Sequence, residues 1–279
     1  MASSLEGVAV VTGGNKGVGL AIVRGLCKQF KGHVLLTARN EENGKSAVEL
    51  LKTEGLNPIY EQLDILSNES IDKFKSRIEK NYGGIDILVN NAGIAYKRAS
   101  TSPLIEKAHV TLQTNLFATL AVTNTLLPHM RNGSHICMVS SMTSKLKNVS
   151  QDKDHPVRQR LIDPSLTEEG VLSLMREYLI AVDNNDYSIW PKDSPYSLSK
   201  VAITAVTRAI GRKLANDPRG IIINACCPGY VDTDMTSHRG VLTPDQGAVT
   251  PLMMCFIPSK GSNGEFYMEE KMYDWLNSD

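Results

Sequence analysis

A tyrosine and a lysine four residues apart, Tyr196 and Lys200 in the stretch YSLSK, have the side chains needed for acid–base chemistry. If Pro195 begins a helix, both side chains lie on one face, about 5–6 Å apart at their β-carbons. An ammonium beside a phenol favours the phenolate, so the lysine would make a tyrosine of ordinary pKa about 10 a better proton donor or acceptor near neutral pH. Such pairs are frequent by chance, and this pair taken alone fits a structural role better than a catalytic one.

A cluster of glycines near the N-terminus, in the stretch TGGNKGVG, separates two patterned segments. Residues 7–12 are an apolar run typical of a strand, and the residues from Leu20 onward repeat their apolar side chains at helical spacing. Where a chain passes from a strand into a helix beside a pyrophosphate, glycines let the backbone approach and the helix N-terminus supplies N–H groups. The spacing of Gly13, Gly17 and Gly19 differs from the common GxGxxG fingerprint, so this motif alone fits an ordinary turn equally well.

Two cations lie where a dinucleotide site tests the adenosine ribose. Arg39 follows the predicted strand 33–38, and Lys16 lies inside the glycine turn. NAD sites usually place a carboxylate at this ribose, whereas a cation pairs with the 2′-phosphate of NADP. Glu41 and Glu42 come next, but at the start of a predicted helix they suit its N-terminal dipole. The two cations favour NADP, and the alternative is that Arg39 is a solvated surface residue.

The elements that must position these residues alternate between strand-like and helix-like patterns. The strand-like runs are apolar on both faces, as expected when helices cover a parallel sheet on both sides. These runs are residues 7–12, 33–38, 59–65, 85–91, 134–141 and 221–227, with helical patterns at 41–53, 68–81 and up to Pro128. The sequence therefore predicts a single doubly wound parallel sheet of the Rossmann type, in one α/β domain spanning residues 1–279.

A charged stretch from Lys145 to Asp193 interrupts this alternation and is predicted to be an insertion within the domain. Inside it, the residues Ser165 to Glu168 (SLTE) have the form of a capping box at a helix N-terminus. The apolar side chains that then share one helical face are Val171, Leu172, Met175, Tyr178, Leu179 and Val182. We expect one extra helix here, ahead of Tyr196.

The composition excludes several classes of protein. Thirty basic and thirty acidic residues cancel, which gives no electrostatic reason to expect a nucleic-acid or anionic-membrane partner. No apolar run approaches 18 residues, and the first residues lack the pattern of a signal peptide. The five cysteines are odd in number without a CxxC, and the six histidines show no HxxxH or HExxH spacing. We predict a cytoplasmic protein without a disulfide framework or a metal site.

Six motifs occur in an order that is far more specific than any one of them. They are TGGNKGVG, NNAG at Asn90 to Gly93, Asn115 in QTNLF, MVSS ending at Ser141, YSLSK, and PGYVDTDM from Pro228. Together they make nearly the whole chain resemble the short-chain dehydrogenase/reductase family. The stretches YGGIDILVNNAGIA and INACCPGYVDTDM, with the long interval between Ser141 and Tyr196, are similar to the monomeric carbonyl reductases of that family.

The resemblance implies a role for each residue of a catalytic set. Tyr196 would be the acid/base, and Ser141 the hydroxyl that holds the substrate oxygen, with Ser140 as the neighbouring alternative. Lys200 would bind the ribose and lower the pKa of the tyrosine. Asn115 would support a water-linked proton relay to Lys200.

The same resemblance assigns residues along NADPH. The glycine turn would hold the phosphates, Arg39 the 2′-phosphate, and Asp64 would lie near the adenine, although Asp64 equally fits a helix cap before Ser67. Asn91 and Gly93 would follow the ribose, and Val231 and Thr233 the nicotinamide carboxamide. The full set is Gly13, Asn15, Lys16, Gly17, Gly19, Arg39, Asp64, Asn91, Gly93, Tyr196, Lys200, Val231 and Thr233.

Three positions bear on selectivity. Asn43 stands where similar enzymes tend to carry a second arginine, which weakens the preference for NADP without reversing it. Tyr230 stands in place of a tryptophan, so we expect the floor of the substrate pocket to differ. Cys227 precedes Pro228 and either lines the substrate site or is a buried core cysteine, the more common state of such a residue.

The implied activity is reduction of a ketone, aldehyde or quinone by NADPH, with Tyr196 as the proton donor. The alternatives are an NADP-dependent dehydrogenase that mainly oxidises alcohols, a catalytically weak nucleotide-sensing protein of the same fold, and an α/β methyltransferase. The resemblance also implies a monomer, with the insertion helix covering the surface through which most family members associate.

Overall fold

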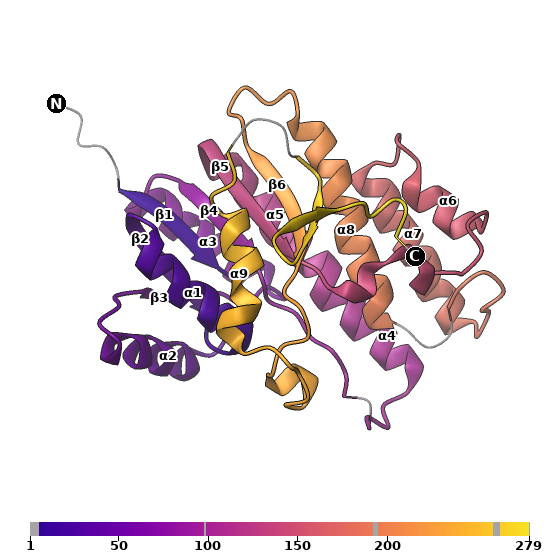
Figure 1. Cartoon of the computed structure of the whole chain (residues 1–279), viewed down its shortest axis with the longest axis horizontal. Helices are drawn as coiled ribbons and strands as arrows, with labels where there is room; N and C mark the ends of the chain where they lie inside the picture. Colours follow the sequence, from indigo (N-terminus) through magenta and orange to yellow (C-terminus); the bar gives the residue numbers. More distant parts are fainter. Residues whose placement is uncertain (1–5, 98, 192–194, 259–262, 279) are drawn as a thin grey trace.

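The computed structural model describes residues 6–97, 99–191, 195–258 and 263–278, arranged around an eight-stranded sheet (Figure 1). The strand order is β3-β2-β1-β4-β5-β6-β7-β8, parallel throughout except for β8, which is antiparallel to β7. The strands are β1 (Gly7–Val11), β2 (Gly32–Ala38), β3 (Ile59–Gln62), β4 (Ile85–Asn90), β5 (Met130–Val139), β6 (Ile222–Cys227), β7 (Phe266–Met268) and β8 (Lys271–Tyr273). The order reverses between β1 and β4, the position at which doubly wound sheets form a ligand crevice at the carboxyl ends of their strands.

Helices cover both faces of the sheet. On one face lie α1 (Gly17–Gln29), α2 (Glu41–Thr53) and α9 (Pro244–Met254), seen in front of the sheet in Figure 1. The opposite face carries α3 (Asn68–Asn81), α4 (Leu104–Leu112), α5 (Thr119–Leu126), α7 (Glu168–Asp183) and α8 (Pro195–Leu214). No helix in these described residues is long and apolar enough to cross a membrane.

The strands divide their side chains between two cores. Val8 and Val10 of β1 pack in the core beneath α8, whereas Ala9 and Val11 pack in the core beneath α1. This alternation follows from the period of two residues along a strand. It explains why the central strands carry apolar side chains on both faces, and it confirms the predicted two-sided sheet.

The predicted insertion differs from expectation in two respects. It forms two helices rather than one, because α6 (Pro156–Ile162) precedes α7. The cap of α7 is Thr167, whose side chain accepts from the Gly170 N–H, and not Ser165. Ser165 instead donates its N–H and hydroxyl to Asp163 Oδ1, so the helix begins two residues later than a cap at Ser165 would give. The last two predicted insertion residues, 192 and 193, lie outside the described part of the chain.

The C-terminal segment returns to the middle of the molecule, an arrangement the sequence did not indicate. Strands β7 and β8 extend the sheet, and the chain then reaches the residues that follow β5. The buried Trp275 donates its indole N–H to the Ser144 carbonyl at 2.7 Å, and Ser278 Oγ accepts from the Leu146 N–H at 3.1 Å. These bonds fix the turn that carries the serines of the MVSS motif.

We expect Gly211→Ala to lower the free energy of unfolding by about 2 kcal/mol or more. A β-carbon at Gly211 in α8 would lie 2.4 Å from the Cα of Gly264, a backbone atom that cannot move alone. Denaturant unfolding measures the change. Gly170→Ala is the control, because its nearest neighbour is the flexible end of Leu166 at 2.9 Å, and its effect should stay within about 1 kcal/mol. Equal stability of the two variants would contradict this reading of the α8 packing.

Candidate active site

The glycine turn between β1 and α1 has the shape of a phosphate cradle. Gly13 and Gly17 have positive φ angles of 62° and 55°, which favour glycine, and Asn15 lies between them, partly exposed. A β-carbon at Gly19 would lie 2.3 Å from the Gly13 carbonyl oxygen. The Asn91 side chain donates to the Thr12 and Gly13 carbonyls at 3.0 and 3.2 Å, so the NNAG motif braces this turn.

The start of α1 is open toward this turn. Its N-cap residue, Lys16, makes no side-chain cap hydrogen bond, so no side chain occupies the first N–H groups in that way. Such groups and the positive end of the helix dipole attract an anion. The turn and the helix end therefore fit a pyrophosphate.

The ribose end of the predicted cofactor site presents Arg39 to solvent directly after β2. Arg39 makes no hydrogen bond or ion pair with another described residue, so its guanidinium is available to an anion. Asn43 contributes its backbone N–H to Asn40 Oδ1, the cap of α2, at 2.8 Å. Glu41, in the first turn of α2, is paired with Lys45 at 2.6 Å, as suits a helix N-terminus.

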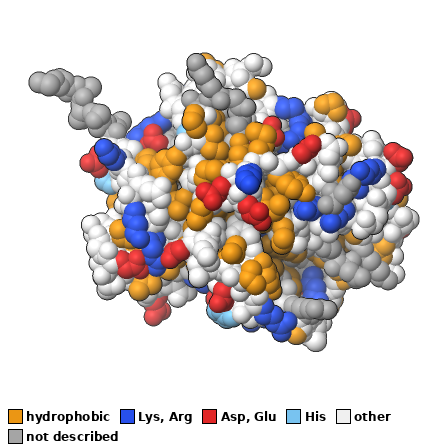
Figure 2. All heavy atoms as spheres, viewed as in Figure 1, with side chains coloured by type: hydrophobic (Ala, Val, Ile, Leu, Met, Phe, Trp, Pro, Cys, Tyr) orange, Lys and Arg blue, Asp and Glu red, His pale blue; other side chains and the backbone are white. Residues whose placement is uncertain are grey.

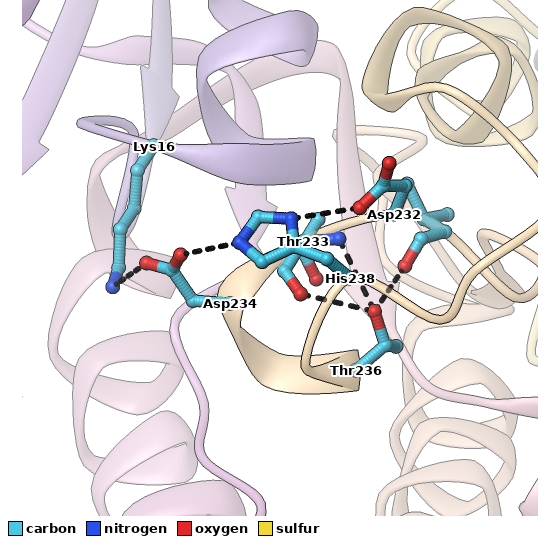
Figure 3. Close-up of polar contacts among 7 residues, drawn as sticks. Lys16, Asp232, Thr233, Asp234, Thr236 and His238 are labelled. Carbon is cyan, nitrogen blue, oxygen red and sulfur yellow. Dashed lines mark hydrogen bonds and ion pairs between the residues drawn. The ribbon is translucent and has the colours of Figure 1, made fainter.

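Lys16 has a partner that the sequence did not indicate (Figure 3). Its Nζ lies 2.7 Å from Asp234 Oδ2, on the short helix η5 (Asp234–Thr236). The hydrogen bond from Lys16 holds the pKa of Asp234 below its ordinary value. Because both side chains are largely exposed, this pair adds little stability, and Lys16 can exchange the carboxylate for a phosphate.

His238 organises the same loop, as Figure 3 shows. Its Nδ1 lies 2.8 Å from Asp232 Oδ1 and its Nε2 3.2 Å from Asp234 Oδ1, and the hydrogen bond to Asp232 raises the pKa of the histidine. Thr233, between the two aspartates, has its methyl group 3.2 Å from where a β-carbon of Gly17 would lie. The predicted nicotinamide segment and the glycine turn are therefore in contact.

Tyr196 and Lys200 share one face of α8, as predicted from their spacing and from Pro195, which begins the helix. The Lys200 ammonium lies 5.8 Å from the centroid of the Tyr196 ring. It is buried and donates to the Val139 carbonyl at 2.8 Å, at the end of β5. Burial lowers the pKa of Lys200 to about 8.

Burial raises the pKa of Tyr196 to about 12, while the neighbouring Ser141 hydroxyl opposes that rise. The lowering of the tyrosine pKa by Lys200 stays a prediction. The ammonium is held by a backbone carbonyl rather than by the phenol oxygen. In this arrangement Tyr196 is protonated throughout the neutral range.

The two serines after β5 point in different directions. The hydroxyl of Ser140 is buried and bonded to the Lys200 carbonyl at 3.1 Å and to Thr204 Oγ1 at 2.8 Å. Ser141 is partly exposed and lies close enough to Tyr196 to lower the pKa of the tyrosine. The geometry thus favours Ser141 over Ser140 as the hydroxyl that can reach a substrate.

Asn115 lies in a π-helical turn, η1 (Gln113–Ala118), between α4 and α5. Its Oδ1 accepts from the Ile94 N–H at 2.8 Å, and its Nδ2 donates to the Ile94 carbonyl at 2.9 Å and to Ser199 Oγ at 3.0 Å. A β-carbon at Gly93 would lie 3.1 Å from Asn115 Oδ1. Asn115 therefore joins the segment after NNAG to α8, and the relay to Lys200 stays a prediction.

Asp64, which was predicted to lie near the adenine, follows β3 at one edge of the sheet. Asp64 does not cap α3, because Ser67 accepts from the Ser70 N–H, and Asp64 Oδ1 instead accepts from Leu66 at 3.0 Å. The alternative of a helix cap at Asp64 is therefore wrong, and its place near the adenine stays a prediction.

The candidate substrate residues differ in their exposure. Cys227 is buried, and its sulfur accepts the N–H groups of Met142 and Gly229. Burial raises the pKa of this thiol, and its contact with substrate stays a prediction. Tyr230 is 44% exposed and Val231 is buried, joined by a bridge to Leu242.

Three residues of the site were missed from the sequence. Ser199 bonds Asn115, Thr143 bonds Ser141, and Asp234 bonds Lys16. The backbone contact of Thr143 had a local signal, because a serine hydroxyl can accept the N–H of the residue two positions later. Asp234 had none, since 218 residues separate it from Lys16.

Comparison with known proteins gives relatives over almost the full chain. Carbonyl reductase (NADPH) 1 of Bos taurus is 41% identical and covers 98% of this chain and 100% of its own length. The protein of the same name from Homo sapiens is 40% identical, over 96% of this chain and 98% of its own.

Solved structures agree with this comparison. Salutaridine reductase from Papaver somniferum superposes with a TM-score of 0.83 at 30% identity, covering 94% of this chain and 99% of its own. Menthone neomenthol reductase from Mentha piperita superposes with a TM-score of 0.75 at 26% identity, covering 95% of this chain and 99% of its own.

The model of the short chain dehydrogenase family matches residues 7–152 and 187–241. The interruption falls on the insertion that carries α7, and the two matched parts hold the glycine turn and the residues around Tyr196. On this match and on the full-length identity to its relatives, the chain belongs to the short-chain dehydrogenase family.

Proposed function

We propose that this protein is an NADPH-dependent carbonyl reductase that reduces ketones, aldehydes or quinones. The observation that carries the proposal is the convergence of Ser141, Tyr196 and Lys200 where β5 ends and α8 begins. The names of the full-length relatives, carbonyl reductases that use NADPH, support the same activity.

The described residues fit NADPH. The glycine turn lacks β-carbons at Gly13, Gly17 and Gly19, where each would meet a neighbouring protein atom. Arg39 and Lys16 are the cations for the 2′-phosphate. When bound, NADPH supplies the hydride that reduces the carbonyl carbon. The chain supplies binding, orientation and the proton.

Each catalytic side chain then has a defined task. Tyr196, protonated at neutral pH, donates its proton to the carbonyl oxygen as negative charge develops there. Ser141 donates a hydrogen bond to the same oxygen. Lys200 binds the ribose hydroxyls, and its positive charge stabilises the phenolate left on Tyr196.

The main alternative, oxidation of an alcohol, would use the same residues with Tyr196 accepting the proton. We infer reduction because the full-length relatives are named carbonyl reductases that use NADPH.

The proposal extends to the whole chain as one reductase domain in the cytoplasm. Its five cysteines are free thiols, which suits a reducing compartment. An open hollow of about 450 Å³ is lined by the segment just after NNAG, and we infer that it forms one wall for the substrate. The lining residues are Ile94, Ala95, Tyr96, Lys97, Ala99 and Ser100.

Initial rates test the proposal. NADPH and NADH are compared on a quinone, a diketone and an aromatic aldehyde, and we expect turnover with NADPH on at least one of them. Absence of NADPH oxidation with all three substrates would reject the assignment.

Tyr196→Phe should lower kcat for carbonyl reduction by about 100-fold or more, because it removes the proton that is transferred. The dissociation constant of NADPH, measured by fluorescence, should change less than about threefold. Tyr82→Phe is the control. It removes a hydroxyl that hydrogen-bonds Glu61 and should keep the parent rate. Retention of most turnover by Tyr196→Phe would contradict its role as the acid.

Arg39→Asp should reduce the preference for NADPH over NADH by about tenfold or more, since a charge-assisted hydrogen bond to phosphate contributes about 1.5–3 kcal/mol. Ratios of kcat/KM for the two cofactors measure this change. Arg176→Asp makes the same charge change on α7 and should leave the ratio as it is. If Arg39→Asp discriminated like the parent, the arginine would not be the phosphate ligand.

We expect the protein to be a monomer, with a mass near 30.6 kDa by light scattering at micromolar concentration. The reason is that α8 is buried along most of its length, with α4 and α7 packed on it. Hydrophobic side chains do gather on the opposite face (Figure 2), where Val249, Phe256 and Met272 are more than 40% exposed. A mass near twice that of the chain would reject the prediction.

A further inference from the structure

The hydroxyl of Ser141 accepts two hydrogen bonds from the same neighbouring residue, Thr143. It accepts a hydrogen bond from the Thr143 N–H at 3.1 Å and another from the Thr143 hydroxyl at 3.2 Å. Thr143 belongs to the short helical turn η3 (Met142–Ser144), and Ser141 is the N-cap of that turn. Thr143 thus contacts the candidate catalytic serine without reaching Tyr196 or Lys200 by any hydrogen bond among the described residues.

The two bonds from Thr143 leave the Ser141 hydroxyl free to act as a hydrogen-bond donor. A serine hydroxyl has one proton to donate and two lone pairs that accept. Thr143 occupies both lone pairs, so the proton of Ser141 is what remains for another partner. Tyr196 is near enough for Ser141 to lower the tyrosine pKa, as expected when a hydroxyl donor stabilises the phenolate oxygen.

The turn that carries Thr143 is itself restrained. The Thr143 carbonyl accepts from Asn148 Nδ2 at 2.8 Å, and the next carbonyl, of Ser144, accepts the indole N–H of Trp275 at 2.7 Å. The Ser144 N–H donates to the Ser141 carbonyl at 3.0 Å. The threonine hydroxyl is therefore placed by the backbone around it.

Ser140 offers a contrast within the same motif. Its hydroxyl is shared between the Lys200 carbonyl and Thr204 Oγ1, so it serves the packing of α8 on the sheet. It has no neighbour that fills both lone pairs from one side. The double contact from Thr143 is thus a feature of the serine that faces Tyr196.

We propose that Thr143 is a positioning residue that makes Ser141 a dedicated hydrogen-bond donor toward the oxygen that gains charge during reduction. A donor fixed in advance costs no reorganisation when that charge develops, which is the basis of oxyanion stabilisation. The proposal rests on the proposed function, because it assigns the direction of Ser141 in that reaction.

The test replaces the threonine hydroxyl and keeps its shape. Thr143→Val retains the backbone donor and the β-branch but removes the second donor to Ser141. We expect kcat for the best carbonyl substrate to fall about tenfold, with KM and the NADPH dissociation constant within about twofold of the parent. Thr143→Ser, which keeps the hydroxyl, should restore most of kcat.

A pH profile separates positioning from a merely structural effect. Reduction needs protonated Tyr196, so kcat falls as pH rises through the tyrosine pKa of the bound enzyme. A loosened Ser141 stabilises the phenolate less, so the falling limb of Thr143→Val should move to higher pH. Thr207→Val is the matched control, because it removes a buried hydroxyl that donates to the Ile203 carbonyl on α8. Its kcat and the falling limb of its pH profile should match those of the parent.

A second readout does not depend on turnover. In protein labelled with ¹³C at the tyrosine Cζ, the Tyr196 resonance is identified by its loss in Tyr196→Phe. Its shift should change in Thr143→Val and Thr143→Ala but not in Thr207→Val. Far-ultraviolet circular dichroism establishes that each variant is folded.

The outcomes distinguish the two proposals. An active parent whose Thr143→Val variant keeps its kcat, pH limb and Tyr196 resonance would overturn the role of Thr143. A loss not rescued by Thr143→Ser, or a rise in KM with an unmoved limb, would also overturn it in favour of substrate binding or folding. A parent inactive on every carbonyl rejects the proposed function, while the Tyr196 resonance still tests the contact from Thr143 through Ser141.

Discussion

The buried ammonium of Lys200 constrains the whole centre of this molecule. A charge inside a protein must have hydrogen-bond partners, and the Val139 carbonyl at the end of β5 is one of them. In return, the hydroxyl of the next residue, Ser140, bonds the Lys200 carbonyl. Strand and helix are therefore tied in both directions at one point, and this tie fixes Ser141 relative to Tyr196.

The candidate cofactor site depends on the close approach of backbone segments to one another rather than on buried charge. Gly19 lies against the Gly13 carbonyl, and Asn91 reaches across from the end of β4 to hold that turn. Two residues later, Gly93 lies against Asn115, whose side chain continues to Ser199 on α8. One short motif after β4 thus connects the phosphate turn with the catalytic helix.

The sequence predicted those elements whose formation is determined by residues near one another in the chain. Six runs became strands because their apolar side chains pack on both faces of the sheet, although those of β3 are only partly buried. Pro195 with the Tyr196 to Lys200 spacing correctly gave a helix with both side chains on one face. Strands β7 and β8 were missed because three residues carry too little pattern. Which serine faces the tyrosine depends on contacts with Thr204, far along the chain, and the pKa of Tyr196 depends on burial that no spacing reveals.

The bonds from Trp275 and Ser278 have a consequence for the order in which the protein is made. They reach back 131 and 132 residues to the turn beside Ser141. A ribosome releases Ser141, Tyr196 and Lys200 long before these late residues leave its exit tunnel. Until then the Ser144 carbonyl and the Leu146 N–H lack these two partners, so the serine turn reaches its final shape only after Trp275 and Ser278 have emerged. Strands β1 to β6 can assemble before that point, but the turn beside the catalytic residues is completed only by a segment that lies more than 130 residues farther along the chain.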